Sequence, residues 1–112
     1  MNGYPDLARE HMEKSISLLD QFNLLHINDS IPQIANYAMF LTKQQEPERG
    51  ISKLQKLSGI IKEYHSDECL DYAKVQENLA TIYLMTANLS QAKTHFKKAF
   101  KIYEKILLMS LK

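Results

Sequence analysis

The sequence predicts an all-α protein of about five helices, which pair into antiparallel hairpins and repeat along the chain. Two observations support this fold class. Apolar residues follow the three-and-four spacing of helices almost throughout, and no stretch alternates with the period of two that a strand requires. In addition, residues of matching size recur 42 positions apart, which is the signature of stacked repeats.

The first expected helix covers residues 5–21. Pro5 and Asp6 open it, because proline is tolerated in the first turn and an early acid suits the positive end of the helix dipole. Its apolar side follows helical spacing at Leu7, Met12, Ile16, Leu19 and Phe22. Residues 23–29 lose this spacing and are expected to form a connection.

The second helix is expected over residues 30–44, with Ser30 as its N-cap and Pro32 in its first turn. Pro47 closes this helix and begins the third, over residues 48–64.

The fourth helix is expected over residues 68–86, capped by Ser66 or Asp67. The turn Ala-Asn-Leu-Ser follows it, and the fifth helix runs from about Ser90 nearly to the end of the sequence.

The period of 42 relates the segments without any shift of register. It aligns Ala8 with Gly50 and Ala92, Met12 with Leu54 and Phe96, and Ser15 with Leu57 and Ala99. The small members are expected to let paired helices approach closely: Ala38, Gly50, Ala80, Ala92 and Ala99. The larger ones, Leu54, Tyr83 and Phe96, are expected to fill the gaps between hairpins, which makes the Tyr and Phe residues core. Truncation of Phe96 to Ala should then cost about 3–5 kcal/mol.

The stretch from Leu79 to Phe100 resembles a tetratricopeptide repeat. The matching residues are Leu79, Ala80, Tyr83, Ala92, Phe96 and Ala99, and the preceding unit matches more loosely through Tyr37, Ala38, Leu41, Gly50, Leu54 and Leu57. The period is similar to that of the long-helix subclass seen in kinesin light chains and in peptide-sensing regulators of Gram-positive bacteria. The resemblance implies a right-handed α-solenoid in a single domain over residues 1–112, with a half repeat at 1–29 (second helix only) and full repeats at 30–66 and 67–112.

The bulk composition excludes several classes of partner. A formal net charge of +1 gives no support for nucleic-acid binding, and we interpret Lys97, Lys98 and Lys101 as the solvated face of a helix. The N-terminal residues lack the pattern of a signal peptide and no stretch is apolar enough for a membrane span, so the expected compartment is the cytoplasm. The single cysteine, Cys69, allows no internal disulfide.

The sequence shows no catalytic or metal-binding pattern. The four histidines have neither metal-ligand spacing nor a partner nucleophile, so we expect no enzyme activity, no cofactor and no metal. His11 and His95 share a repeat position with Lys53, which predicts that this position faces solvent.

The candidate binding residues lie on the first helix of each hairpin, which lines the concave face of such an array. They are Asn36, Met39 and Lys43 on the second helix and Lys74, Asn78, Thr81 and Met85 on the fourth. Asn36 and Asn78 lie one period apart, and an amide can both donate to and accept from a peptide backbone. The family resemblance implies this role for an Asn at the matched position, and it makes Lys74 with Asn78 part of a carboxylate clamp, although one basic residue of that clamp is replaced here by Asn78.

The predicted function is therefore a protein–protein interaction module that binds a peptide or partner segment in the concave groove. The alternative is a self-associating or regulatory fragment of a larger repeat protein. It rests on two ends that look uncapped, because the last helix carries Ile106, Leu107, Leu108, Met109 and Leu111 with no repeat after it. A homodimer through one terminal helix is the form of self-association expected.

Overall fold

The computed structural model describes residues 4–111 and contains, over that range, five α-helices and no strand. The helices are α1 (Tyr4–Gln21), α2 (Ser30–Lys43), α3 (Pro47–Tyr64), α4 (Leu70–Met85) and α5 (Leu89–Ser110). Every bound that the sequence predicts for them lies within about two residues of the observed one, as expected for boundary assignment. The all-α helical-repeat fold is confirmed.

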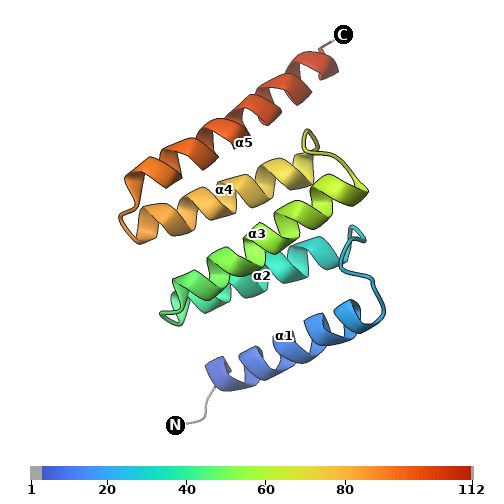
Figure 1. Cartoon of the computed structure of the whole chain (residues 1–112), viewed down its shortest axis with the longest axis vertical. Coiled ribbons are helices and arrows are strands. Elements are labelled where there is room, and N and C mark those ends of the chain that lie inside the picture. The colour runs from blue at the N-terminus through green and yellow to red at the C-terminus, as the bar shows by residue number, and fades with distance from the viewer. Residues whose placement is uncertain (1–3, 112) are drawn as a thin grey trace.

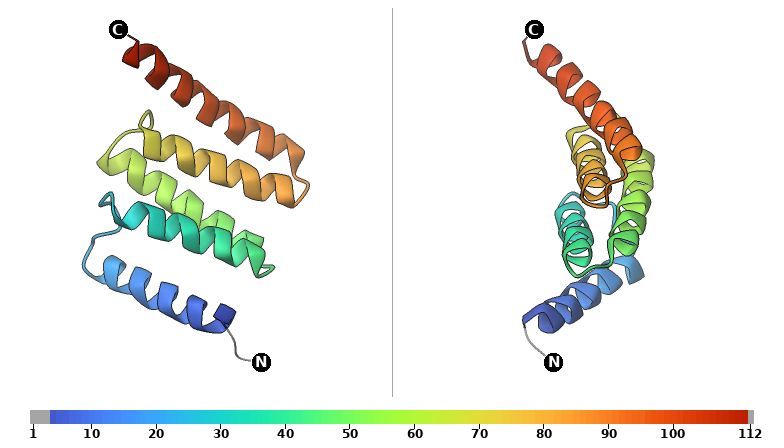
Figure 2. Two further views of the ribbon diagram at one scale, coloured as in Figure 1. Left: turned by 180° about the vertical axis from the view of Figure 1, so that it is seen from behind. Right: turned by 90° about the vertical axis from the view of Figure 1, so that its left-hand side faces the viewer.

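The helices stack in chain order, each antiparallel to the one before it (Figure 1). The pairs α2 with α3 and α4 with α5 form hairpins, and α3 packs on α4 to join them. In the side view of Figure 2, α2 and α4 lie on one side of the stack and α3 on the other, while α1 and α5 run obliquely across its two ends. The two ends lean toward the side of α2 and α4, so these two helices form the inner side of a curved stack.

The core lies where α2, α3 and α4 meet. Its buried apolar residues include Ile34, Leu54, Leu57, Ile61, Val75, Leu79 and Ile82. The small residues predicted to allow close helix approach are all buried: Ala38, Gly50, Ala80, Ala92 and Ala99. At Gly50 the approach is so close that a Cβ atom would lie 2.6 Å from the backbone oxygen of Ala38.

The prediction that Phe96 belongs to the core is wrong. Its repeat counterpart Leu54 is 0% exposed, whereas Phe96 is 38% exposed. The physical reason is that α4 packs over the face of α3 that carries Leu54, while no helix in residues 4–111 covers the corresponding face of α5. The wider prediction that the Tyr and Phe residues are core also fails for several rings. Some lie on the uncovered face of α5, and others lie at a helix end. Tyr37 is buried and Tyr83 half-buried, but the exposed rings also include Phe22, Tyr64 and Phe100.

Two predicted N-caps are also wrong. Ser30 lies inside α2, and its buried hydroxyl donates to the Leu24 carbonyl at 2.8 Å, so it ties the preceding connection to the helix instead of capping it. Ahead of α4, the Ser66 hydroxyl accepts from the Glu68 backbone N–H at 2.9 Å, and the helix begins only after Cys69. Both hydroxyls satisfy groups in the connections, a use that competes with capping.

His95 does not face solvent as its repeat position predicts. Its ring is half-buried and stacks on Tyr83, with ring centroids 5.5 Å apart. Its Nδ1 atom lies 2.7 Å from Oε1 of buried Gln76, and the Gln76 amide nitrogen donates to the Ser58 hydroxyl at 3.0 Å. Burial, with a smaller effect from Lys98, lowers the pKa of His95 below its ordinary value. The neutral ring therefore joins α3, α4 and α5 through one polar chain, whereas His11 on α1 is exposed as predicted.

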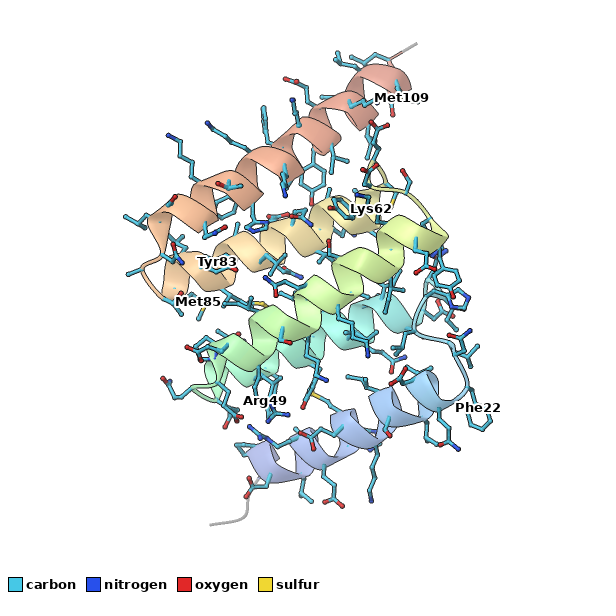
Figure 3. The ribbon with its side chains drawn as sticks, viewed as in Figure 1. Phe22, Arg49, Lys62, Tyr83, Met85 and Met109 are labelled. Atoms are coloured by element: carbon cyan, nitrogen blue, oxygen red, sulfur yellow. The ribbon has the colours of Figure 1, made fainter. Side chains whose placement is uncertain are left out.

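Polar contacts attach α1 to the rest of the stack. Arg9 pairs with Glu46, whose carboxylate also accepts from Arg49 at 2.9 Å. Arg49 lies near the start of α3, on the side toward α1 (Figure 3). The Tyr37 hydroxyl donates to Glu13 at 2.7 Å, and burial together with this bond raises the pKa of Tyr37 to about 12. Partly buried Ile16 and Leu19 of α1 add apolar contact with the core.

We expect acid to weaken this attachment. Hydrogen bonds from Arg9 and Arg49 hold the pKa of Glu46 below its ordinary value of 4.5. Glu46 therefore contributes stability that is fully present above about pH 4.5 and is lost as the pH falls through its lower folded-state pKa. The difference in Tm between the wild type and Glu46→Gln should shrink below that pH, as measured by circular dichroism melts from pH 7 to pH 3. Glu48→Gln, at an exposed position without an ion pair in the described range, is the matched control. A difference that stays constant down to pH 3 would contradict the prediction.

Candidate functional site

The inner side of the stack brings together the two helices that carry the predicted binding residues. On α2, Asn36 and Lys43 are exposed, and Met39 is half-buried with its side chain against the core. Their spacing of three and four residues places all of them on one face of the helix. This face points away from buried Tyr37 and Leu41.

The corresponding face of α4 carries the other predicted residues. Lys74 and Met85 are exposed, and Met85 lies at the C-terminal end of the helix (Figure 3). Asn78 and Thr81 are half-buried. The Thr81 hydroxyl donates to the Glu77 carbonyl at 2.9 Å, which leaves its oxygen free only to accept a further bond. The open face of α4 thus offers one amide, one ammonium group and one flexible apolar side chain.

Side chains of α5 make polar contacts with α4 and with the residues just before it. The Tyr103 hydroxyl donates to the Glu77 carboxylate at 2.8 Å, and burial together with this bond raises the pKa of Tyr103 to about 12. Lys105 donates to Glu68 at 2.7 Å, next to the start of α4. Lys74 makes no ion pair within residues 4–111, so its charge is available to a partner.

Residues of α1 also border the candidate site, which the sequence did not predict. Asn36 and Gln33 of α2 line a hollow of about 190 Å³ together with residues of α1, which are His11, Met12, Ser15 and Ile16. The 42-residue period shows which positions are equivalent, but it does not show how the first helix leans on the second. No pattern in the sequence would have placed α1 beside Asn36.

A second cavity, of about 330 Å³, lies between α1 and α3 and has walls of opposite charge. Glu13 and Asp20 of α1 face Arg49, Lys53 and Lys56 of α3 across it. Four of these five charged residues already pair across the gap, Arg49 with Glu13 at 3.8 Å and Lys56 with Asp20 at 3.9 Å. Because only Lys53 of its five charged residues has no ion pair in residues 4–111, this cavity is better explained by the attachment of α1 than by a ligand.

Residues 4–111 contain neither a candidate metal-binding cluster nor a candidate membrane-spanning helix. Between residues 4 and 111 no group of three or more His, Cys, Asp or Glu side chains could hold a metal ion. None of the five helices is both long enough and apolar enough to cross a membrane.

Comparison with known proteins agrees with this geometry. The family model of the tetratricopeptide repeat matches residues 30–105, which cover α2, α3, α4 and most of α5. No significant match is found among curated proteins. Because the matched range spans well over half of the sequence, the chain belongs to the tetratricopeptide repeat family.

Proposed function

We propose that the protein is a protein–protein interaction module that binds an extended peptide or partner segment across the open faces of α2 and α4. Membership of the tetratricopeptide repeat family supports a role in protein–protein interaction. One observation carries the finer proposal. Asn36 and Asn78, equivalent residues of two repeats, both lie on open faces of helices that are neighbours on the inner side of the stack.

The chemistry of these faces favours a particular kind of ligand. Two amides one repeat apart can each donate to and accept from the backbone of an extended chain, which gives affinity without reading its sequence. Met39 and Met85 supply flexible apolar surface that adapts to different side chains. Exposed Lys43 and Lys74 favour a ligand that carries a carboxylate.

The amide contacts can be tested directly. Random peptides displayed on phage are selected on the intact chain, and the dissociation constant of a selected peptide is measured for the wild type and for Asn36→Ala/Asn78→Ala. If each amide loses a net of one hydrogen bond, at about 0.5–1.5 kcal/mol, binding should weaken by about 5- to 150-fold.

The matched control removes two exposed amides on the other helices, Gln55→Ala on α3 and Gln91→Ala on α5. Its affinity should equal that of the wild type, and melting curves should show that both double variants are folded. Equal affinity for the Asn36→Ala/Asn78→Ala variant would rule out this binding face.

A specific observation also favours a second candidate function, self-association through a terminal helix. The C-terminal part of α5 and its C-cap residue expose a run of large apolar side chains, namely Leu107, Leu108, Met109 and Leu111. An uncovered patch of this kind is typical of an interaction surface. Sedimentation equilibrium at micromolar concentration distinguishes the two candidates, because only the second requires a mass above that of the monomer.

The spacing of the repeats bears on the subclass of the tetratricopeptide repeat family to which the chain belongs. The period of 42 residues is preserved between the hairpins α2–α3 and α4–α5, from Gly50 to Ala92 and from Leu54 to Phe96. We propose on this ground that the chain belongs to the long-helix subclass of the family.

A further inference from the structure

In the first half of α5, several exposed apolar side chains lie together and form a groove. This α5 groove is a shallow hollow of about 710 Å³, and its lining consists of Leu84, Leu89, Ala92, Lys93, Phe96, Lys97, Phe100 and Lys101. Its large apolar members are strongly exposed, 64% for Leu89 and 66% for Phe100. The sequence pattern gave no sign of this groove, because it predicted Phe96 to be core and Lys97 and Lys101 to lie on an ordinary solvated face.

The repeat shows what kind of element fits this groove. Subtracting 42 from its residue numbers gives the matching positions on the first hairpin, which include Thr42, Pro47, Gly50, Leu54 and Ser58. On that hairpin α4 covers the surface. Leu54 is therefore buried in one cluster with Val75, Leu79 and Ile82 of α4. A Cβ atom at Gly50 would lie 3.4 Å from the Ile82 side chain. The same molecule therefore shows a helix with an aliphatic face seated on an equivalent surface.

The α5 groove differs from its counterpart in charge. Lys93, Lys97 and Lys101 form a row at its edge, with one lysine in each successive turn. The matching residues on α3 are Ile51, Gln55 and Gly59, none of which is charged. None of the lysines in this row makes an ion pair within residues 4–111. A helix that fits the groove should therefore carry carboxylates beside its apolar face.

We propose that the α5 groove is a docking site for an acidic amphipathic helix of a partner protein, which packs on α5 as α4 packs on α3. Phe96 and Phe100 supply the apolar anchors, and the row of lysines sets the charge of the partner. The site is separate from the open faces of α2 and α4, and it does not depend on the function proposed for them.

The charge pattern favours a different protein over a second copy of this chain. On α1 of a second copy, exposed Leu7 and Leu18 lie on one side of the helix, with exposed His11 and Lys14 between them. Three acids of α1 already pair, Glu10 with Lys14, Glu13 with Arg49 and Asp20 with Lys56, which leaves Asp6 as the one acid of this helix without an ion pair in residues 4–111. It therefore offers no free row of carboxylates to the lysines of α5.

The probe is a fluorescent, helix-stapled peptide with the sequence of residues 70–86, which keeps Val75, Leu79 and Ile82. The acidic peptide carries glutamate on both flanks of this apolar stripe, and the basic peptide carries lysine at the same positions, which are 74, 76, 81 and 83. Binding to the intact chain is followed by fluorescence anisotropy. We expect saturable binding of the acidic peptide, at least about ten-fold tighter than that of the basic peptide.

Variants of the chain then locate the contact. Phe100→Ala should weaken binding of the acidic peptide at least about ten-fold, since aromatic anchors dominate such interfaces. Charge reversal of the row, Lys93→Glu/Lys97→Glu/Lys101→Glu, should invert the preference so that the basic peptide binds more tightly. The matched control makes the same change in net charge at exposed lysines outside the groove, Lys14→Glu/Lys62→Glu/Lys98→Glu, and should keep the wild-type preference.

Three results would overturn the proposal. The first is equal affinity for the acidic and basic peptides, or no binding of either. The second is binding that is lost in Asn36→Ala/Asn78→Ala but unchanged in Phe100→Ala, which would place the peptide on α2 and α4. The third is a wild-type dimer in sedimentation that Phe100→Ala converts to a monomer, which would make a second copy the occupant of the groove.

Discussion

Leu54→Ala should lower the free energy of unfolding by about 2–5 kcal/mol, although its repeat counterpart Phe96→Ala removes a larger side chain and should cost only about 1–2 kcal/mol. Leu54 is 0% exposed and lies in one cluster with Ala38, Leu79 and Ile82, so truncation leaves a cavity among side chains of three helices, α2, α3 and α4. Phe96 is 38% exposed, and water can fill the space that its ring leaves, so no cavity remains.

Urea unfolding followed by circular dichroism measures both free energies on the intact chain. Phe100→Ala serves as a second surface reference, because its ring is 66% exposed and its loss should change the free energy by no more than about 0.5–1 kcal/mol. If Phe96→Ala proved more destabilising than Leu54→Ala, the exposure of the α5 groove in the free protein would be wrong.

The contrast between Leu54 and Phe96 shows how far a repeat pattern can predict a fold. Spacing alone identified five helices and the small residues at close contacts, because both follow from local periodicity and from size at equivalent positions. Burial also depends on the neighbour. Equivalent residues share a register but not a covering helix, so the pattern could not show that α4 covers one of them while nothing in residues 4–111 covers the other.

Some features of the candidate site could likewise be predicted from helical spacing, and others could not. Helical spacing was enough to place Asn36 and Asn78 on open faces of α2 and α4, since that placement depends only on each helix and its buried side. The hollow beside Asn36 and the stacking of His95 on Tyr83 depend on how neighbouring helices lean on each other. Such tertiary contacts leave no mark at a fixed spacing in one sequence. The capping errors at Ser30 and Ser66 have a local cause, because a hydroxyl can bond either to a helix end or to the connection before it.

The two glycines of α3 should respond to alanine in opposite directions. A Cβ atom at Gly50 would lie 2.6 Å from both the Ala38 backbone oxygen and the Thr42 hydroxyl oxygen, which themselves share a hydrogen bond of 3.0 Å. The Thr42 side chain can rotate, but the backbone oxygen cannot move unless α2 and α3 separate. At Gly59 a Cβ atom would meet nothing within 4 Å.

Gly50→Ala should therefore destabilise the protein by about 1–3 kcal/mol, because the cost of overpacking exceeds the gain in helix propensity. Gly59→Ala keeps that gain without a clash and should stabilise by about 0.5–1 kcal/mol. Both values come from the same urea titrations, and the glycines lie on one helix, so differences in propensity between sites largely cancel. Gly50→Val should be worse than Gly50→Ala, since its branches extend toward Ile82, which already lies 3.4 Å from the added Cβ position. If both alanine variants were stabilised equally, α2 and α3 would have to lie farther apart than described here, and the close approach that defines this hairpin would be wrong.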